Sequence, residues 1–209
     1  MKSTIDWIYD KKWWFLGGVV LIGGVLIYVN RDKEKAMAKE LLGGQKWFDE
    51  SLKWYRDNNT KGIVSKLHPQ FRDKVKEFFS RVEKELGLQM YATSGYRTFE
   101  EQAILKRNNK NNAEAGFSDH NYGFAIDVNV IDPKTGKIIL KKANTSKDWE
   151  NSGVVKISKE MGLNWGGGGA FGSYHDPVHF YEKPKGLSTA SMRELHNSGK
   201  IDSNGYVII

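Results

Sequence analysis

The sequence SDHNYGFAID occupies residues 118–127, and DPVHF follows at residues 176–180. Together they supply two histidines, a carboxylate ligand and a spare acid. Catalytic zinc takes three protein ligands through nitrogen and oxygen atoms and keeps a fourth position for water, whereas a structural site is closed by four ligands that usually include cysteine. The chain contains no cysteine. The two stretches therefore indicate a catalytic metal site, with zinc as the expected ion.

His120 and Asp127 need a bend between them to share one ion. A fully extended chain would separate their Cα atoms by roughly 23 Å. Residues 121–123, Asn-Tyr-Gly, provide the bend because Asn and Gly tolerate positive φ. Residues 125–130 then predict a buried strand that carries Asp127. An unpaired carboxylate in this apolar run would be costly, so a metal or a cationic partner is expected.

Asp176 and His179 are three residues apart with a proline between them, a spacing that suits a turn presenting both side chains to one point. If His179 is the third ligand, Asp176 remains a free acid. A carboxylate beside a metal centre can take a proton from an attacking water and pass it to a departing amine. The second stretch thus adds a candidate acid and base to the candidate ligands.

The chain resembles the D-alanyl-D-alanine carboxypeptidase family of zinc peptidases. The first stretch matches the pattern S-x-H-x(6)-D and the second matches [DE]-x-x-H. Residues 67–71 (LHPQF), 93–102 (TSGYRTFEEQ) and 162–180 (GLNWGGGGAFGSYHDPVHF) are similar to the branch that contains phage and bacterial L-alanyl-D-glutamate endopeptidases. The resemblance covers residues 60 to 183, approximately, and predicts a peptidase.

The resemblance also implies roles for individual residues. The implied zinc ligands are His120, Asp127 and His179. Asp176 would be the catalytic acid and base, and Arg97 would hold the substrate and stabilise the developing oxyanion. Ser118 would support the site beside the first ligand. Trp165 is either a core aromatic or a wall of the substrate groove.

Other residues carry weaker signals. The remaining histidines are expected to be structural or solvated: His68, His175 and His196. The glycine run 166–169 lacks the Gly-Lys-Ser/Thr sequence of a phosphate-binding loop. This run and residues 171–175 depart from the WGG and Asp-Trp that are usual in the family, which affects the expected substrate choice but not the metal.

Residues 13–29, WWFLGGVVLIGGVLIYV, are uncharged. Their length is at the lower limit for crossing a bilayer, and aromatic residues at the rims suit the interface. They predict a single N-terminal transmembrane helix within an anchor at residues 1–30. A signal peptide cleaved after the Ala-Met-Ala of residues 36–38 and a buried core helix are the alternatives. The lysines and arginines on the two sides do not decide the orientation.

Residues 31–60 predict a linker helix, residues 61–183 the peptidase domain and residues 184–209 an extension with a short helix and a strand at 206–209. A helix is expected from Pro69 to Gly87, because apolar side chains recur at steps of three and four. Its apolar positions are Phe71, Val75, Phe78, Val82 and Leu86.

Three further patterns complete the fold prediction. Thr98 and Glu101 form a capping-box pattern for a following helix. A turn at residues 132–136 joins the Asp127 strand to residues 137–140 in a hairpin. The predicted class is α+β, with a small antiparallel sheet and flanking helices that carry the zinc site.

The expected function is cleavage of the peptidoglycan stem peptide, at the L-alanyl-D-glutamate bond. D-alanyl-D-alanine carboxypeptidase activity and a catalytically silent wall-binding or virion-associated structural protein are the alternatives. The net charge of +7 favours anionic partners, but no nucleic-acid fold motif accompanies it, so no nucleic-acid partner is expected. The expected location is membrane-anchored with the domain on the cell-wall side, in the periplasm or outside the cell, for a bacterial or a phage-encoded protein.

Overall fold

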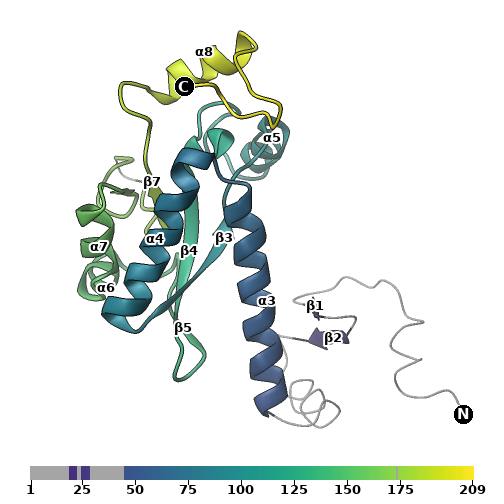
Figure 1. Cartoon of the computed structure of the whole chain (residues 1–209), viewed down its shortest axis with the longest axis vertical. Coiled ribbons are helices and arrows are strands. Elements are labelled where there is room, and N and C mark those ends of the chain that lie inside the picture. Colours follow the sequence, from purple (N-terminus) through teal and green to yellow (C-terminus); the bar gives the residue numbers. More distant parts are fainter. Residues whose placement is uncertain (1–18, 23–24, 29–44, 173) are drawn as a thin grey trace, which may run out of the picture. The chain divides into compact units, whose positions relative to one another are not determined.

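The computed structural model describes residues 19–22, 25–28, 45–172 and 174–209. The chain divides into two compact units, Met1–Asn58 and Asn59–Ile209. The first unit contains strands β1 (Val19–Ile22) and β2 (Val25–Tyr28), which pair antiparallel. Helix α3 (Gln45–Ser65) crosses the boundary between the units (Figure 1).

The described part of the apolar N-terminal run differs from its prediction. A helix was expected over residues 13–29, whereas the described residues of that run form β1 and β2. Both strands are rich in valine and isoleucine, whose branched side chains favour extended backbone. The rest of the run, and the Ala-Met-Ala motif at 36–38, lie outside the described residues. No helix in the described part of the chain is both long enough and apolar enough to cross a bilayer.

The described part of the second unit contains a five-stranded antiparallel sheet with the order β3-β4-β7-β6, and β5 pairs with β4. The strands are β3 (Gln89–Ser94), β4 (Ala125–Asp132), β5 (Lys137–Leu140), β6 (Asn164–Trp165) and β7 (His179–Tyr181). The predicted hairpin is confirmed, because β4 and β5 pair antiparallel around the turn at residues 132–136, with a shift of register between Val130 and Ile131.

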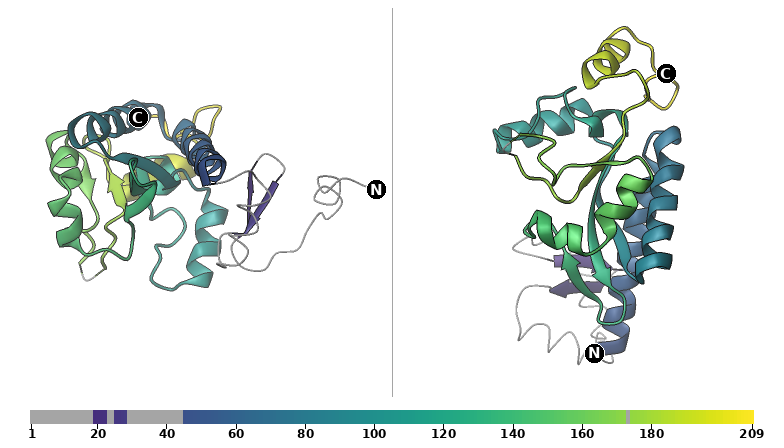
Figure 2. Two further views of the ribbon diagram at one scale, coloured as in Figure 1. Left: turned by 90° about the horizontal axis from the view of Figure 1, so that it is seen from below. Right: turned by 90° about the vertical axis from the view of Figure 1, so that its left-hand side faces the viewer.

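Helix α4 (Pro69–Leu86) confirms the predicted helix and covers one face of this sheet (Figure 2). Four of its five predicted apolar positions are fully buried, namely Phe71, Val75, Phe78 and Val82. The ring of Phe78 lies 5.1 Å from the ring of Phe180 in β7. The helix ends at Gly87, which takes the left-handed conformation common at C-termini.

Side chains along β4 alternate between the two faces of the sheet, which places the core on one face and Asp127 on the other. Ile126, Val128 and Val130 are fully buried, whereas Asp127 and Asn129 are only half-buried. Successive side chains of a strand point to opposite faces. The face covered by α4 is therefore the apolar core, and the other face of the sheet carries Asp127.

The other helices are short. They are α5 (Phe99–Asn108), α6 (Ser146–Asn151), α7 (Val154–Glu160), α8 (Thr189–Asn197) and the 3₁₀ helix η1 (Asp119–Tyr122). The capping box of Thr98 and Glu101 is confirmed at the start of α5. Helix α6 was not predicted, and it begins with a capping box of its own, from Thr145 and Asp148. Helices around an antiparallel sheet confirm the α+β class.

The C-terminal extension belongs to the second unit. Met192 of α8 and Val207 are buried in the same core cluster as α4. The strand predicted at residues 206–209 is reduced to one bridge between Ile201 and Val207. The Tyr206 hydroxyl instead donates a hydrogen bond to the Lys66 carbonyl oxygen at 2.9 Å, so the segment is held by isolated contacts rather than by a sheet.

Gly123→Ala should destabilise the fold strongly. Gly123 has φ +75°, and an added Cβ would lie 2.5 Å from the backbone nitrogen of His68. Left-handed backbone costs an alanine about 1 kcal/mol, and the contact with rigid backbone raises the expected loss to about 3 kcal/mol or more. Urea unfolding monitored by fluorescence measures the free energy of unfolding.

Gly136→Ala is the matched control, because Gly136 has φ +67° but no heavy atom within 4 Å of an added Cβ. It should lose only about 1 kcal/mol. Equal losses in the two variants would show that the close approach of Gly123 to His68 is unimportant.

Candidate metal centre

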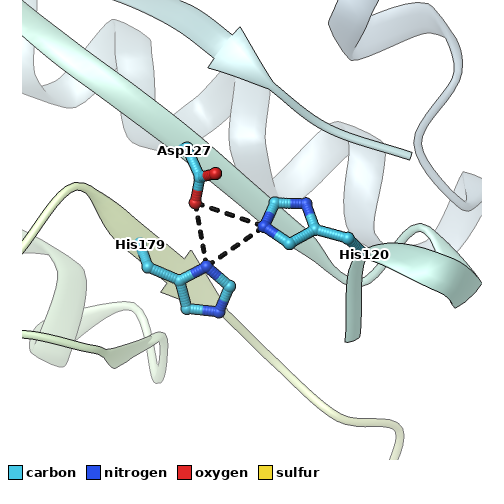
Figure 3. A group of neighbouring side chains, drawn as sticks. All are labelled: His120, Asp127 and His179. Atoms are coloured by element: carbon cyan, nitrogen blue, oxygen red, sulfur yellow. Dashed lines mark hydrogen bonds and ion pairs between the residues drawn. The ribbon is translucent and has the colours of Figure 1, made fainter. Parts of the chain in front are cut away.

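Three side chains converge on the face of the sheet that carries Asp127: His120, Asp127 and His179 (Figure 3). Asp127 Oδ1 lies 3.2 Å from His120 Nε2 and 2.9 Å from His179 Nδ1. The two histidine nitrogens are 3.2 Å apart. The structure therefore brings together the three residues that the sequence predicted as metal ligands.

Strand register places two of the three side chains together. Asp127 in β4 is directly opposite His179 in β7, and Ser94 in β3 is opposite Asp127 on its other side. Residues that face each other across paired strands lie on the same face of a sheet. The Asp-to-His contact thus follows from the pairing of β4 with β7.

His120 reaches the other two candidate ligands through the predicted bend. It lies in η1, and Gly123 ends that turn with φ +75°. The Gly123 carbonyl oxygen accepts a hydrogen bond from the His68 backbone N–H at 3.1 Å. This bond ties the bend to the start of α4, so the core fixes the position of His120.

The protonation states of the group suit a cation. His120 Nδ1 is 2.6 Å from the Gly95 carbonyl oxygen, so a neutral ring donates from Nδ1 and presents the lone pair of Nε2 to the site. Burial lowers the pKa of His120, which keeps the ring neutral at neutral pH. Burial opposes ionisation of Asp127. A proton on His120 or His179 would attract the carboxylate and be shared with it in a hydrogen bond, and this effect outweighs burial and holds the pKa of that carboxyl well below its usual range.

The donor set fits zinc. Two imidazole nitrogens and one carboxylate oxygen are ligands of catalytic zinc sites. Bonds of about 2.0–2.2 Å in tetrahedral geometry separate ligand atoms by roughly 3.3–3.6 Å, close to the distances in this group. Metal ligands bind in their deprotonated forms, which are the forms that the pKa shifts of His120 and Asp127 favour.

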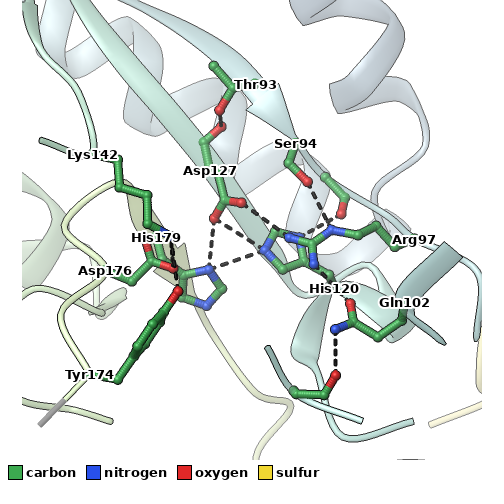
Figure 4. Close-up of polar contacts among 12 residues, drawn as sticks. Thr93, Ser94, Arg97, Gln102, His120, Asp127, Lys142, Tyr174, Asp176 and His179 are labelled. Carbon is green, nitrogen blue, oxygen red and sulfur yellow. Dashed lines mark hydrogen bonds and ion pairs between the residues drawn. The ribbon is translucent and has the colours of Figure 1, made fainter. Parts of the chain in front are cut away.

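Arg97 contacts the second oxygen of Asp127. Its Nη2 donates to Asp127 Oδ2 at 3.2 Å, its Nε to Ser94 Oγ at 3.0 Å and its Nη1 to Gln102 Oε1 at 2.9 Å (Figure 4). Burial lowers the pKa of Arg97, although the negative charges of Asp127 and Asp176 act to raise it. An arginine remains charged in spite of such a shift. In this arrangement Arg97 orients the Asp127 carboxylate.

Asp176 lies beside His179, whose backbone N–H donates to the Asp176 carbonyl oxygen at 3.2 Å. Its carboxylate is largely buried, and Oδ1 has no hydrogen-bond partner. Its Oδ2 is 3.3 Å from Lys142 Nζ, which also donates to the Tyr174 hydroxyl at 3.0 Å (Figure 4). A buried acceptor without a partner is costly and often marks a functional group. The free Oδ1 is the feature expected of a group that receives a proton from a bound reactant.

Comparisons with known proteins agree with this geometry. The sequence model of the family described as D-alanyl-D-alanine carboxypeptidase matches residues 111–181. The peptidoglycan L-alanyl-D-glutamate endopeptidase CwlK of Bacillus subtilis (strain 168) is 33% identical over 128 residues, which cover 54% of this chain and 74% of the relative. The chain belongs to the D-alanyl-D-alanine carboxypeptidase family. It is a metallopeptidase, and the predicted resemblance is confirmed, including its proximity to the endopeptidase branch.

Two solved structures resemble this D-alanyl-D-alanine carboxypeptidase family member more distantly. The L-Ala D-Glu endopeptidase ChiX of Serratia marcescens has a TM-score of 0.44 at 19% identity, covering 60% of this chain and 86% of that chain. The LD-carboxypeptidase LdcB has a TM-score of 0.45 at 21% identity, covering 61% of this chain and 64% of that chain.

Two other predicted site residues of this family member, Trp165 and Ser118, lie outside the group of candidate ligands. Trp165 is buried, and its indole N–H donates to the Pro177 carbonyl oxygen at 2.8 Å. Of the two alternatives for Trp165, this placement favours the core aromatic over the groove wall. Ser118 precedes η1 but makes no capping hydrogen bond with its side chain. Its backbone carbonyl accepts from Asn121 N–H at 2.9 Å, so its visible contribution is to the turn.

The three remaining histidines lie outside the ligand group. His68 is buried against Phe124, with ring centroids 4.4 Å apart. His196 stacks on Phe99 at 4.3 Å, and His175 is exposed. His68 and His196 therefore have the expected structural roles, and His175 is exposed to solvent as expected.

Several residues of the site were missed by sequence reasoning. Gln102 holds Arg97 and donates to the Ala113 carbonyl oxygen at 2.8 Å; its place on the buried side of α5 was a usable signal. Thr189 of the extension donates to Asp119 Oδ1 at 2.8 Å, directly beside His120. Lys142 lies 34 positions before Asp176 in the chain, and no local pattern marks it.

Proposed function

We propose that this chain is a zinc peptidase that cleaves the peptidoglycan stem peptide between L-alanine and D-glutamate. The proposal of hydrolysis rests on the convergence of His120, Asp127 and His179 beside Asp176, whose buried Oδ1 has no partner. The choice of bond is supported by the 33% identity to a peptidoglycan L-alanyl-D-glutamate endopeptidase.

When bound, zinc would polarise the scissile carbonyl and make a water molecule more acidic. Asp176 accepts a proton from the attacking water as the water oxygen bonds to the carbonyl carbon. It then delivers this proton to the amine nitrogen as the carbon–nitrogen bond breaks. The immediate products are a carboxylic acid and a free amine, and Asp176 is restored. The proton that remains on the acid then passes to the amine, which leaves a carboxylate and an ammonium group.

Arg97 has five N–H donors, of which three are used by Ser94, Gln102 and Asp127. One N–H on each terminal nitrogen remains for the substrate. Through them Arg97 would stabilise the negative charge that develops on the carbonyl oxygen. In this proposal Arg97 orients a ligand and binds substrate at the same time.

The bond is identified by digesting purified muropeptides with the full-length protein and weighing the products by mass spectrometry. Cleavage between L-alanine and D-glutamate is expected, with activity lost on chelation and restored by zinc. Loss of a single D-alanine with the L-alanyl bond intact would instead support D-alanyl-D-alanine carboxypeptidase activity, the activity after which the family is described. Binding to sacculi without any released fragment would support a silent wall-binding or virion-associated protein.

We further propose that residues 13–29 hold the protein at a membrane, with the peptidase unit on the cell-wall side. The support is the composition of the run, which is uncharged with aromatic rims. Fractionation of the full-length protein tests this. It should sediment with membranes and resist extraction by alkaline carbonate, and recovery in the soluble fraction would reject the anchor.

A further inference from the structure

Lys142 is a cation next to the proposed catalytic acid. Its Nζ lies 3.3 Å from Asp176 Oδ2 and 3.0 Å from the Tyr174 hydroxyl, and its side chain is 59% exposed. A lysine ammonium has three N–H donors. Two of them serve these partners, so the third is open to a group that arrives from solvent.

The position of Lys142 is set by a fixed turn between β5 and α6. The Lys141 carbonyl oxygen accepts from the buried indole of Trp149 at 3.4 Å and from the Asn144 backbone N–H at 3.0 Å. Ser146 ties this turn to the Gly167 carbonyl oxygen at 2.6 Å. The backbone that carries Lys142 is therefore attached both to the core and to the loop that precedes Asp176.

Lys142 remains charged in this place. Burial alone would lower its pKa, but the hydrogen bond to Tyr174 and the charge of Asp176 outweigh burial and raise the pKa above the ordinary value. Arg97 and Lys183 have acidic partners of their own, Asp127 and Asp119. Lys142 thus supplies a lasting positive charge at the side of Asp176.

The chemistry of the leaving group decides what this charge can bind. Asp176 must approach the nitrogen that leaves. In an α-amino acid that nitrogen and the carboxyl group are bound to the same carbon, so the carboxyl lies within a few ångströms of the acid that protonates the nitrogen. A D-glutamate that continues through its side-chain carboxyl keeps a free α-carboxylate, as does a terminal D-alanine.

We propose that Lys142, supported by Tyr174, binds the α-carboxylate of the amino acid on the leaving side of the scissile bond. This subsite rests on the proposed cleavage beside D-glutamate. It makes Lys142 a specificity-determining residue, because charge-assisted hydrogen bonds are about twice as strong as neutral ones. A substrate whose α-carboxyl is an amide loses the charge and is bound less well.

The test uses two stem peptides that differ in one group, L-alanyl-D-glutamate with a free α-carboxylate and the matching L-alanyl-D-isoglutamine. The wild-type protein should prefer the carboxylate about tenfold or more in kcat/KM. Lys142→Met should reduce this preference to less than about threefold, mainly through a higher KM for the carboxylate peptide, and Lys142→Arg should retain most of it. Lys141→Met removes the same charge one residue away and should leave the preference unchanged.

Two results would overturn the subsite. The first is a wild-type protein with no preference between the peptides. The second is Lys142→Met lowering kcat equally on both, which would make Lys142 a partner of Asp176 alone. If neither peptide is cleaved at its L-alanyl bond, the proposed site of cleavage is wrong, and the subsite for D-glutamate fails with it. The three results differ, so failure of the subsite is separate from failure of the function.

Discussion

Asp176→Asn should lower kcat by about 10³-fold, within the range of about 10²–10⁴ for a general acid and base. The amide keeps the shape of the side chain but cannot accept the proton of the attacking water. The metal should stay bound, because the converging ligand atoms belong to His120, Asp127 and His179. Muropeptide turnover measures kcat, and metal analysis of the dialysed protein measures zinc content.

Asp73→Asn is a suitable control. Asp73 is an exposed acid on α4 whose carboxylate contacts Lys76 at 2.8 Å, and its removal should change neither turnover nor zinc content. If Asp176→Asn retained wild-type turnover with full zinc content, Asp176 would have no part in proton transfer. If it lost zinc together with activity, its role would be to maintain the metal centre.

The parts of the fold that follow from local periodicity were predictable from sequence. The steps of three and four from Phe71 to Val82 predicted α4, and Thr98 with Glu101 predicted the start of α5. These signals depend on contacts between residues close in sequence. The apolar run that carries Asp127 gave β4 for the same reason.

The convergence of His120, Asp127 and His179 was predictable because the motifs that contain them are compact and chemically restrictive. The spacing from His120 to Asp127 required a bend, and the structure supplies it at Gly123. What sequence did not show was register. The pairing of Asp127 with His179 joins segments 52 residues apart, and such pairing depends on the whole sheet.

The surroundings of Asp176 were the least predictable part of the site. Lys142 is one of many lysines in a basic chain, and nothing in the neighbouring sequence distinguishes it from the others. Only tertiary packing, through Trp149 and Ser146, places it beside the acid. Similarly, Arg97 was assigned to substrate, although three of its donors bind protein groups. Partners that come from distant turns leave no local pattern in the sequence.

Asp127→Asn should weaken zinc binding by about 100-fold or more and remove peptidase activity at ordinary zinc concentrations. Asp127 contributes the one anionic ligand atom of the group, and its Oδ1 lies within 3.2 Å of both histidine nitrogens. The substitution removes that charge and leaves the Arg97 guanidinium without its carboxylate partner. Competition with a fluorescent zinc chelator gives the dissociation constant.

His175→Ala is the control. It removes a histidine, a residue type that can bind zinc, but His175 is exposed and lies outside the group of His120, Asp127 and His179. It should bind zinc as tightly as the wild type does. Activity of Asp127→Asn should recover in part at high zinc concentrations, since the two imidazoles remain. Wild-type affinity in Asp127→Asn would mean that the ion does not use this carboxylate. Recovery of the affinity by Asp127→Glu would point to charge rather than side-chain length as the requirement.

Arg97→Met should also weaken zinc binding, but only by about 10-fold, because Arg97 holds the other carboxylate oxygen of Asp127 and does not itself contact the ion. A large loss of affinity in Asp127→Asn and a smaller loss in Arg97→Met would distinguish direct contact of Asp127 with the metal from the orientation of its carboxylate.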